Sequence, residues 1–165
     1  MRIVRKVHID IPAQSLTTFD NDNVVKVYSV STALNGAGQS NGSGCTPTGS
    51  HYIRAKIGTN SPLGSVFIGR RPTGEVYSDA LAEQFPARDW ILSRILWLSG
   101  LTPGYNRLSN SAGRVDTMAR YIYIHGTPDT EPMGVPKSHG CIRMRNADVV
   151  ELFDWVPKSC PVFIE

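Results

Sequence analysis

One cysteine and two histidines are grouped in a glycine-rich part of the sequence. Ile124-His125-Gly126 is followed by a proline-containing loop and then by Ser138-His139-Gly140-Cys141. A thiol nucleophile needs a neighbouring imidazole or a positive field to lower its pKa, and acyl transfer also needs N–H donors where the oxyanion forms. Cys141 lies sixteen positions after His125 (141 − 125), across a loop that can fold back. This spacing predicts a thiol nucleophile with a histidine base.

The same residue types admit structural interpretations. A single cysteine usually packs as a small hydrophobe, and we interpret Cys45 and Cys160 in that way. His125, His139 and Cys141 could instead bind zinc, although a structural zinc site requires four ligands and only three are grouped here. The residues alone therefore leave both an enzyme and a metal-binding module open.

Length and composition limit the classes of protein. The 165 residues, 41% of them hydrophobic, predict a single domain over residues 1–165 with a proper core. A net charge of +3 is too small for a nucleic-acid partner but is compatible with an anionic small substrate. No segment approaches the roughly 20 apolar residues that cross a bilayer, so we expect no membrane span. No cofactor is indicated.

The N-terminus and the cysteines bear on location. Residues 1–8 are basic, and no apolar stretch with a small-residue cleavage site follows them. If Met1 is the natural start, we expect a cytoplasmic protein; otherwise we expect the periplasm or cell envelope. An odd number of widely spaced cysteines suits a reducing compartment.

The pattern along the chain is mainly that of a β protein. Short β-branched runs between turn residues predict strands at residues 8–11, 15–19, 24–30, 52–57, 65–69, 75–78, 120–124 and 161–164, with a turn at 72–74. Apolar spacing predicts one helix over residues 86–98 and another over 147–156, capped by Asn146. Residues 35–45 have the composition of a flexible surface loop or a mobile lip on a cleft. We therefore expect a mainly β sheet or sandwich with two short helices and a catalytic cysteine loop.

Ser138-His139-Gly140-Cys141, preceded by His125-Gly126 and followed by Ile142-Arg143, resembles the signature of the L,D-transpeptidase (YkuD-type) catalytic domain. Thr46-Pro47-Thr48-Gly49 is similar to a further segment of that family, and the early strands fall where the family has its opening sheet. Residues 77–115 depart from the pattern, and we expect them to form one wall of a cleft.

The resemblance implies roles for the residues of the motif. Cys141 is expected to be the nucleophile and His125 the general base and acid, with the Gly126 carbonyl orienting the imidazole. The N–H groups of Gly140 and Cys141 are expected to form the oxyanion hole. His139 is expected to organise the loop or the pocket.

Arginines beside the motif are candidates for substrate binding. Arg143 is the better candidate to hold a stem-peptide carboxylate, because the motif places it near the nucleophile, and Arg145 is equally compatible with a solvated surface. Tyr123, Lys137 and Ser138 are further candidates for the substrate pocket.

The resemblance also implies the reaction. The expected substrates are peptidoglycan tetrapeptide stems or muropeptides, which lose their terminal D-alanine as a thioester forms. We expect water to accept the acyl group, which is L,D-carboxypeptidase activity as in cell-wall recycling. The alternative is an amine acceptor and a 3→3 cross-link. An inactive peptidoglycan-binding domain is a minor alternative, and carbapenem-type β-lactams are expected to acylate Cys141.

Overall fold

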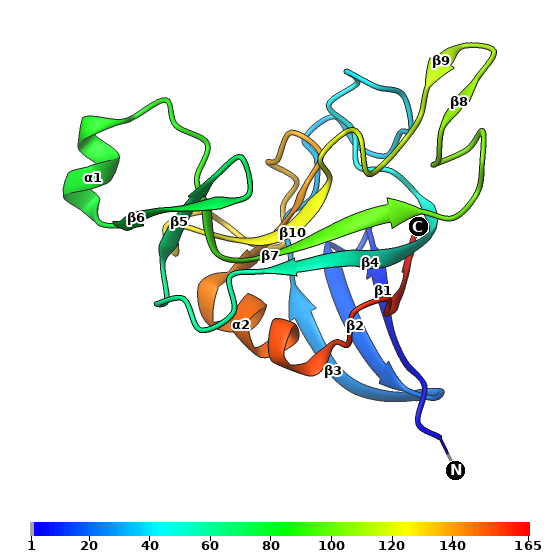
Figure 1. The fold of residues 1–165 in the computed structure, drawn as a ribbon, viewed down its shortest axis with the longest axis horizontal. Helices are drawn as coiled ribbons and strands as arrows, with labels where there is room; N and C mark the ends of the chain where they lie inside the picture. The colour runs from blue at the N-terminus through cyan, green and yellow to red at the C-terminus, as the bar shows by residue number, and fades with distance from the viewer. Residues whose placement is uncertain (1) are drawn as a thin grey trace.

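The fold, seen here in a computed structural model that describes residues 2–165, is built on one large β-sheet (Figure 1). Its ten strands include the series β11-β10-β7-β4-β12-β1-β2-β3, and the β5–β6 hairpin joins the sheet at β7. The strands are β1 Arg5–Asp10, β2 Ser15–Asp20, β3 Asn23–Ser29, β4 Gly49–Ile57, β5 Ser65–Ile68, β6 Arg71–Val76, β7 Ile91–Gly100, β10 Tyr123–Thr127, β11 Ile142–Arg145 and β12 Pro161–Ile164, and a separate hairpin comprises β8 Ser109–Asn110 and β9 Gly113–Arg114. The helices are α1 Asp79–Gln84 and α2 Asn146–Trp155.

The first and last strands of the chain, β1 and β12, pair with each other in the middle of the sheet. β1 pairs antiparallel with β2 and parallel with β12, which in turn pairs antiparallel with β4. The mainly β prediction is confirmed, as are strands close to the positions predicted at residues 8–11, 15–19, 24–30, 52–57, 65–69 and 161–164. The strands predicted at 75–78 and 120–124 are displaced to β6 at 71–76 and β10 at 123–127, because turns occupy 69–70 and 118–121. None of the helices in the described residues is long and apolar enough to span a membrane.

The predicted helix over residues 86–98 is wrong, because most of that stretch is strand β7. β7 is buried on both faces: Leu96 and Leu98 belong to one core cluster, and Ile95 belongs to the other. A strand buried on both faces carries a nearly continuous apolar run, which resembles a buried helix in sequence. Ser93, with φ +70°, also interrupts the strand's alternation.

The second predicted helix is confirmed as α2, which begins at Asn146 rather than after it. The residue in the N-cap position is Arg145, and the buried Asn146 side chain instead bonds Ser93 and Thr127. The helix α1 was not predicted, and the predicted turn at residues 72–74 lies inside β6, because the hairpin turns at Gly69-Arg70.

Helix α2 and the alternation of β10 and β11 divide the sheet into two faces. Ile124, Ile142 and Met144 are fully buried and lie in the same core cluster as the apolar residues of α2. Because successive strand residues point to opposite faces, their neighbours in β10 and β11 point away from α2. That second face carries the candidate site.

Candidate active site

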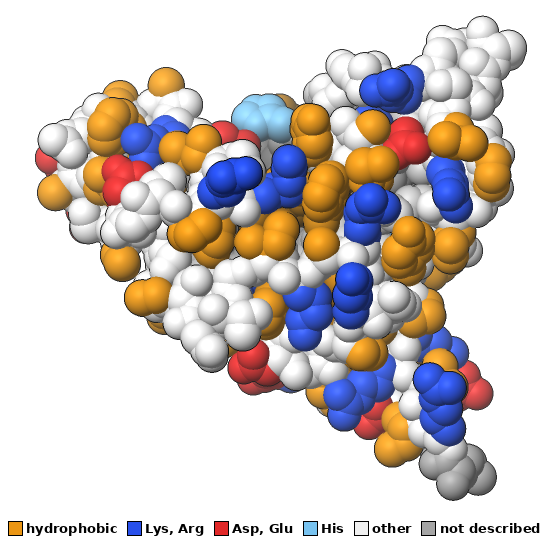
Figure 2. Space-filling view, in the orientation of Figure 1, with side chains coloured by type: hydrophobic (Ala, Val, Ile, Leu, Met, Phe, Trp, Pro, Cys, Tyr) orange, Lys and Arg blue, Asp and Glu red, His pale blue; other side chains and the backbone are white. Residues whose placement is uncertain are grey.

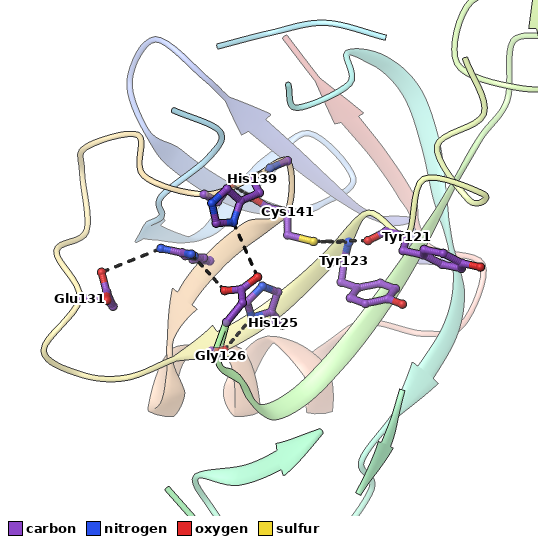
Figure 3. A network of polar contacts seen from close by, with 11 residues as sticks. Tyr121, Tyr123, His125, Gly126, Glu131, His139 and Cys141 are labelled. Carbon is purple, nitrogen blue, oxygen red and sulfur yellow. Dashed lines mark hydrogen bonds and ion pairs between the residues drawn. The ribbon is translucent and has the colours of Figure 1, made fainter. Parts of the chain in front are cut away.

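The pairing of β10 with β11 brings the predicted nucleophile and the predicted base to one face. The two strands are parallel, and His125 pairs with Arg143. Tyr123 lies two residues before His125, and Cys141 lies two residues before Arg143, so period-two alternation places all four side chains on the same side. The sequence prediction that Cys141 and His125 act together is consistent with this placement, and Figure 3 shows both in one view.

The His125 ring is held in one orientation. Its side chain is buried, and Nδ1 lies 2.7 Å from the carbonyl oxygen of Gly126. A carbonyl only accepts, so Nδ1 carries the proton and Nε2 is the basic nitrogen. Burial lowers the pKa of His125 below its usual value, which favours the neutral base. The expected orienting role of the Gly126 carbonyl matches this contact.

The Cys141 thiol lies against the backbone of β10. The N–H of Tyr123 donates to Sγ over 3.3 Å, and the thiol donates to the carbonyl of Tyr121 over 3.4 Å (Figure 3). Burial raises the pKa of Cys141 to about 11, against the opposing effect of the Tyr123 N–H. The resting pair is therefore a neutral thiol and a neutral imidazole.

Gly126 is required by close packing. A Cβ there would lie 2.5 Å from the carbonyl oxygen of Leu92 and 2.6 Å from Oδ1 of Asn146. The same point on β10 carries a register shift between His125 and Gly126. Because Gly126 has no side chain, β7 and α2 can pack closely against β10 beside the His125 ring.

The loop before Cys141 is held by internal hydrogen bonds. The Ser138 hydroxyl donates to the Cys141 carbonyl over 2.6 Å and accepts from the N–H of Gly140 over 3.2 Å. Thr46 donates to the Gly140 carbonyl over 2.9 Å. Ser138 therefore organises the loop, and the Gly140 N–H already has an acceptor, whereas no acceptor is recorded for the Cys141 N–H among residues 2–165.

Arg143 is engaged by carboxylates of this chain. Its guanidinium lies 3.2 Å from Asp89 and 3.9 Å from Glu131. The exposed His139 ring approaches the same Asp89 carboxylate at 3.8 Å. The exposed His139 ring thus lies beside the Asp89–Arg143 ion pair, while Arg145 is exposed near Asp148.

Cys141 and His125 both line a cleft of about 510 Å³. Asp89 and Ile91 line it, so residues 77–115 do contribute a wall. Two arginines that the sequence did not single out, Arg70 and Arg120, line it as well, whereas the predicted Lys137 does not. Neither arginine belongs to a recognisable sequence motif. The one sequence signal for either of them was a position near the end of a predicted strand.

Arg120 connects the cleft to the glycine-rich segment 35–45. Its guanidinium donates to the carbonyls of Gly38, Gln39 and Cys45 and to the Ser43 hydroxyl, at 2.6–3.3 Å. These contacts give the segment a defined position beside the cleft.

Neither Cys45 nor Cys160 lines the cleft, and the alternative of a metal site finds no support in the described residues. Cys160 is buried in the main core cluster, and Cys45 is half-buried; both are free thiols. Within residues 2–165, no three His, Cys, Asp or Glu side chains are arranged to hold a metal ion, so His125, His139 and Cys141 do not form a ligand group.

Comparison with known proteins gives a family and a fold. The model of the L,D-transpeptidase catalytic domain family (YkuD) matches residues 4–164. YqjB of Bacillus subtilis (strain 168), which its name classes provisionally as an L,D-transpeptidase, is 46% identical over 48 residues, which are 29% of this chain and 27% of YqjB.

Solved structures of L,D-transpeptidases share the fold at low sequence identity. A cysteine-to-serine mutant of the Enterococcus faecium enzyme matches with a TM-score of 0.58 at 16% identity, over 98% of this chain and 50% of that one. LdtMt1 in complex with imipenem matches with a TM-score of 0.54 at 18% identity, over 99% and 59%. This chain thus spans 50–59% of the length of these two structures. The family match over nearly the whole chain, on a fold that brings Cys141 and His125 to one cleft, shows that the chain belongs to the L,D-transpeptidase (YkuD) catalytic domain family.

Proposed function

We propose that this chain is a cysteine-dependent L,D-carboxypeptidase that removes the terminal D-alanine from peptidoglycan tetrapeptide stems, as in the recycling of cell-wall fragments. The observation that carries the proposal is the contact between His125 Nδ1 and the Gly126 carbonyl at 2.7 Å. It leaves Nε2 as a base on the face of the sheet that also carries the Cys141 thiol.

The acylation step starts from two neutral groups. Sγ of Cys141 attacks the carbonyl carbon at the L-centre of the diamino acid, and the thiol proton passes to Nε2 of His125. The Cys141 N–H is the candidate donor to the developing oxyanion. His125 then returns the proton to the departing nitrogen, the C–N bond breaks, and D-alanine leaves a thioester on Cys141.

Hydrolysis of the thioester uses the same groups in reverse. His125 takes a proton from water as the oxygen attacks the thioester carbonyl, and the C–S bond breaks. The proton then returns to Sγ and restores the resting thiol. We favour water as the acceptor because it reaches an open cleft without a second binding site, whereas an amine acceptor needs one.

Transpeptidation is the second candidate. A cavity of about 160 Å³ shares Asp89, His139 and Arg143 with the catalytic cleft and offers room for the amine-bearing side chain of an acceptor stem. The solved relatives are also described as L,D-transpeptidases. An amine bound there would attack the same thioester and form a 3→3 cross-link.

Mass spectrometry of products tests the proposal. The purified protein is incubated with a disaccharide-tetrapeptide, with and without an acceptor stem, beside Cys141→Ala and the control Cys45→Ala. We expect tripeptide and D-alanine from the wild type and from Cys45→Ala, and none from Cys141→Ala. A cross-linked dimer as the main product would favour the second candidate, and no D-alanine would refute the first.

We also propose that carbapenems acylate Cys141. LdtMt1 is described in complex with imipenem. A strained β-lactam carbonyl offers the thiol an activated acyl donor in the same cleft. Intact-protein mass spectrometry is expected to show one imipenem adduct on the wild type and none on Cys141→Ala.

A further inference from the structure

Arg70 occupies an unfavourable backbone position at the tip of the β5–β6 hairpin. Ile68 pairs with Arg71, so Gly69 and Arg70 form a two-residue turn. Their φ angles are +57° and +65°, the left-handed values of a type I′ turn. Glycine and asparagine suit such positions, and a residue such as arginine loses roughly 1–2 kcal/mol there. An arginine at this position points to a use for its side chain.

The Arg70 guanidinium lies on an aromatic platform inside the cleft. Its carbon atom is 4.5 Å from the ring centroid of Trp97 and 5.0 Å from that of Tyr121. Nη1 donates to the Tyr123 hydroxyl over 3.0 Å. No carboxylate oxygen of residues 2–165 lies within 4.0 Å of its nitrogens, and no acceptor is recorded for Nε or Nη2. The side chain is oriented by uncharged neighbours and retains free donors.

The other two arginines of the cleft are already engaged. Arg143 lies 3.2 Å from Asp89 and 3.9 Å from Glu131, so two carboxylates balance its charge. Arg120 donates to carbonyl and hydroxyl oxygens of segment 38–45. Among the three arginines of the cleft in the described chain, Arg70 is therefore the one with neither a carboxylate partner nor a set of backbone acceptors around its guanidinium.

Arg70 and Cys141 share two neighbours, Tyr121 and Tyr123. Tyr121 and Tyr123 contact its guanidinium with their side chains, and their backbone groups contact Sγ of Cys141. In the proposed substrate, three bonds of roughly 1.3–1.5 Å separate the scissile carbonyl carbon from the carboxylate of the terminal residue. A group that binds this carboxylate must therefore lie in the same cleft as the nucleophile, and Arg70 and Cys141 both line that cleft.

We infer that Arg70, seated on Trp97 and Tyr121 and bonded to Tyr123, binds the terminal carboxylate of the departing D-alanine. The inference rests on the proposed function, and it replaces Arg143 as the expected carboxylate-binding residue. Charge-assisted hydrogen bonds from a guanidinium suit a carboxylate, and an uncharged platform leaves the cation free to make them. The subsite selects stems in which the residue after the scissile bond carries a free carboxylate, and it disfavours stems that are longer or amidated at that end.

Binding in a catalytically inactive background tests the subsite separately from turnover. In Cys141→Ala, calorimetric Kd values are compared for a tetrapeptide stem and for the same stem with a C-terminal carboxamide. We expect the free carboxylate to bind about 10- to 100-fold more tightly, as for a hydrogen bond between charged groups. Adding Arg70→Asn is expected to reduce this preference to near unity, because asparagine suits the turn but lacks the charge.

Arg71→Asn is the matched control. Arg71 is the next residue on the same hairpin, is exposed, and does not line the cleft. Its replacement removes the same charge and is expected to leave the preference intact. Thermal melting is expected to show that Arg70→Asn folds as stably as its parent, since asparagine relieves the turn.

Two outcomes would overturn the inference: equal binding of the two stems by the parent, or an unchanged preference in Arg70→Asn. Neither would refute the proposed function, which depends on D-alanine release by the intact thiol. Conversely, absence of D-alanine release alongside an Arg70-dependent carboxylate preference would refute hydrolysis and leave the subsite standing.

Discussion

At the scale of single residues, burial shapes the chemistry of Cys141 and His125. It raises the pKa of the thiol and lowers that of the imidazole, so both groups are uncharged at rest. The proton then moves during attack on the substrate, rather than before the substrate binds. The reactivity of a neutral thiol–imidazole pair rises up to a high pH, whereas that of a preformed thiolate–imidazolium pair is already maximal near neutral pH.

The pH dependence of thiol alkylation distinguishes these two states. Because the pKa of Cys141 is about 11, we expect its thiolate fraction and its rate of alkylation by iodoacetamide to keep rising to about that pH. Peptide mapping by mass spectrometry isolates Cys141 from the other two thiols. A short model peptide with one unperturbed cysteine, measured in the same buffers, is expected to reach half its maximal rate near about pH 8.5. A plateau of the Cys141 rate near neutral pH would instead indicate an ion pair.

Thr46 positions the catalytic loop through one hydroxyl. Oγ1 donates to the Gly140 carbonyl and accepts from the Ala33 N–H, both over 2.9 Å. Thr46→Val keeps the shape but leaves both buried groups unpaired, so we expect a loss of about 1–3 kcal/mol in unfolding free energy and slower D-alanine release.

Urea unfolding and D-alanine release measure the two effects of Thr46→Val. Thr17→Val is the control, because the half-buried Thr17 hydroxyl on β2 has no recorded hydrogen bond in the described chain. If both variants behaved alike, the hydrogen bonds of Thr46 would have no positioning role.

At the scale of elements, the junction of β7, β10 and α2 orients the base. Ser93 of β7 donates to Asn146 Oδ1 over 2.6 Å, and Asn146 Nδ2 donates to the Thr127 carbonyl over 3.0 Å. These bonds tie the start of α2 to both strands where β10 shifts register after His125. The position of the His125 ring therefore depends on how closely the three elements pack.

Gly126→Ala tests this junction. The added Cβ would meet the Leu92 carbonyl oxygen at 2.5 Å, so the strands must separate. We expect a loss of about 1–3 kcal/mol in unfolding free energy, as for an overpacked core, together with a large loss of D-alanine release. Chemical denaturation and the product assay measure the two effects.

Gly134→Ala is the matched control for Gly126→Ala. Gly134 has φ +82° and no atom within 4 Å of an added Cβ, so alanine meets only backbone strain of roughly 1–2 kcal/mol. We expect it to retain activity. Full activity in Gly126→Ala would show that close packing there does not position His125.

At the scale of the whole molecule, the large sheet contributes to both core clusters and also contains a buried histidine, His51. His51 of β4 is buried between β12 and β7, with Nδ1 3.0 Å from the Gly49 carbonyl and Nε2 2.8 Å from the Thr117 hydroxyl. Burial lowers its pKa to about 4. This histidine ties the segment before β10 to the centre of the sheet, far along the chain from the catalytic residues.

The depressed pKa of His51 makes folding sensitive to acid. Between pH 6.5 and about 4, the unfolded state binds the proton and the folded state does not, so stability falls as pH falls through this window. The full contribution of this group is about 3 kcal/mol. The lowered pKa of His125 acts in the same direction.

Urea unfolding at pH 7 and pH 4.5 measures this effect. His51→Gln is expected to be less stable at pH 7 but to lose less stability between the two pH values than the wild type. His8→Gln, which alters a half-buried histidine of β1 that pairs with Glu165, is the matched control for replacing a histidine. An unchanged slope in His51→Gln would assign the acid sensitivity to other groups.

Local sequence was sufficient to predict most strands of the first half, α2 and β12, and the placement of Cys141 and His125 on one cleft agrees with their predicted roles. The motif around Cys141 and His125 has a specific spacing, and alternation or 3.6-residue periodicity over a short window predicts an element that has one exposed face. Local sequence could not predict where residues 77–115 lie in the fold, or which side chains each arginine contacts. Both depend on which segments of the chain lie next to one another in the folded protein.

The sequence by itself therefore determined the family resemblance and the fold class, and it predicts a nucleophile and a base, because these depend on residue types at close spacing. Only the tertiary structure decided that residues 91–100 form a strand, because burial on both faces removes the alternation that identifies one. It also decided that Asp89 and Glu131 neutralise Arg143 while Arg70 remains unpaired. Charge pairing is set by distances between segments far apart in the chain, and local patterns do not contain those distances.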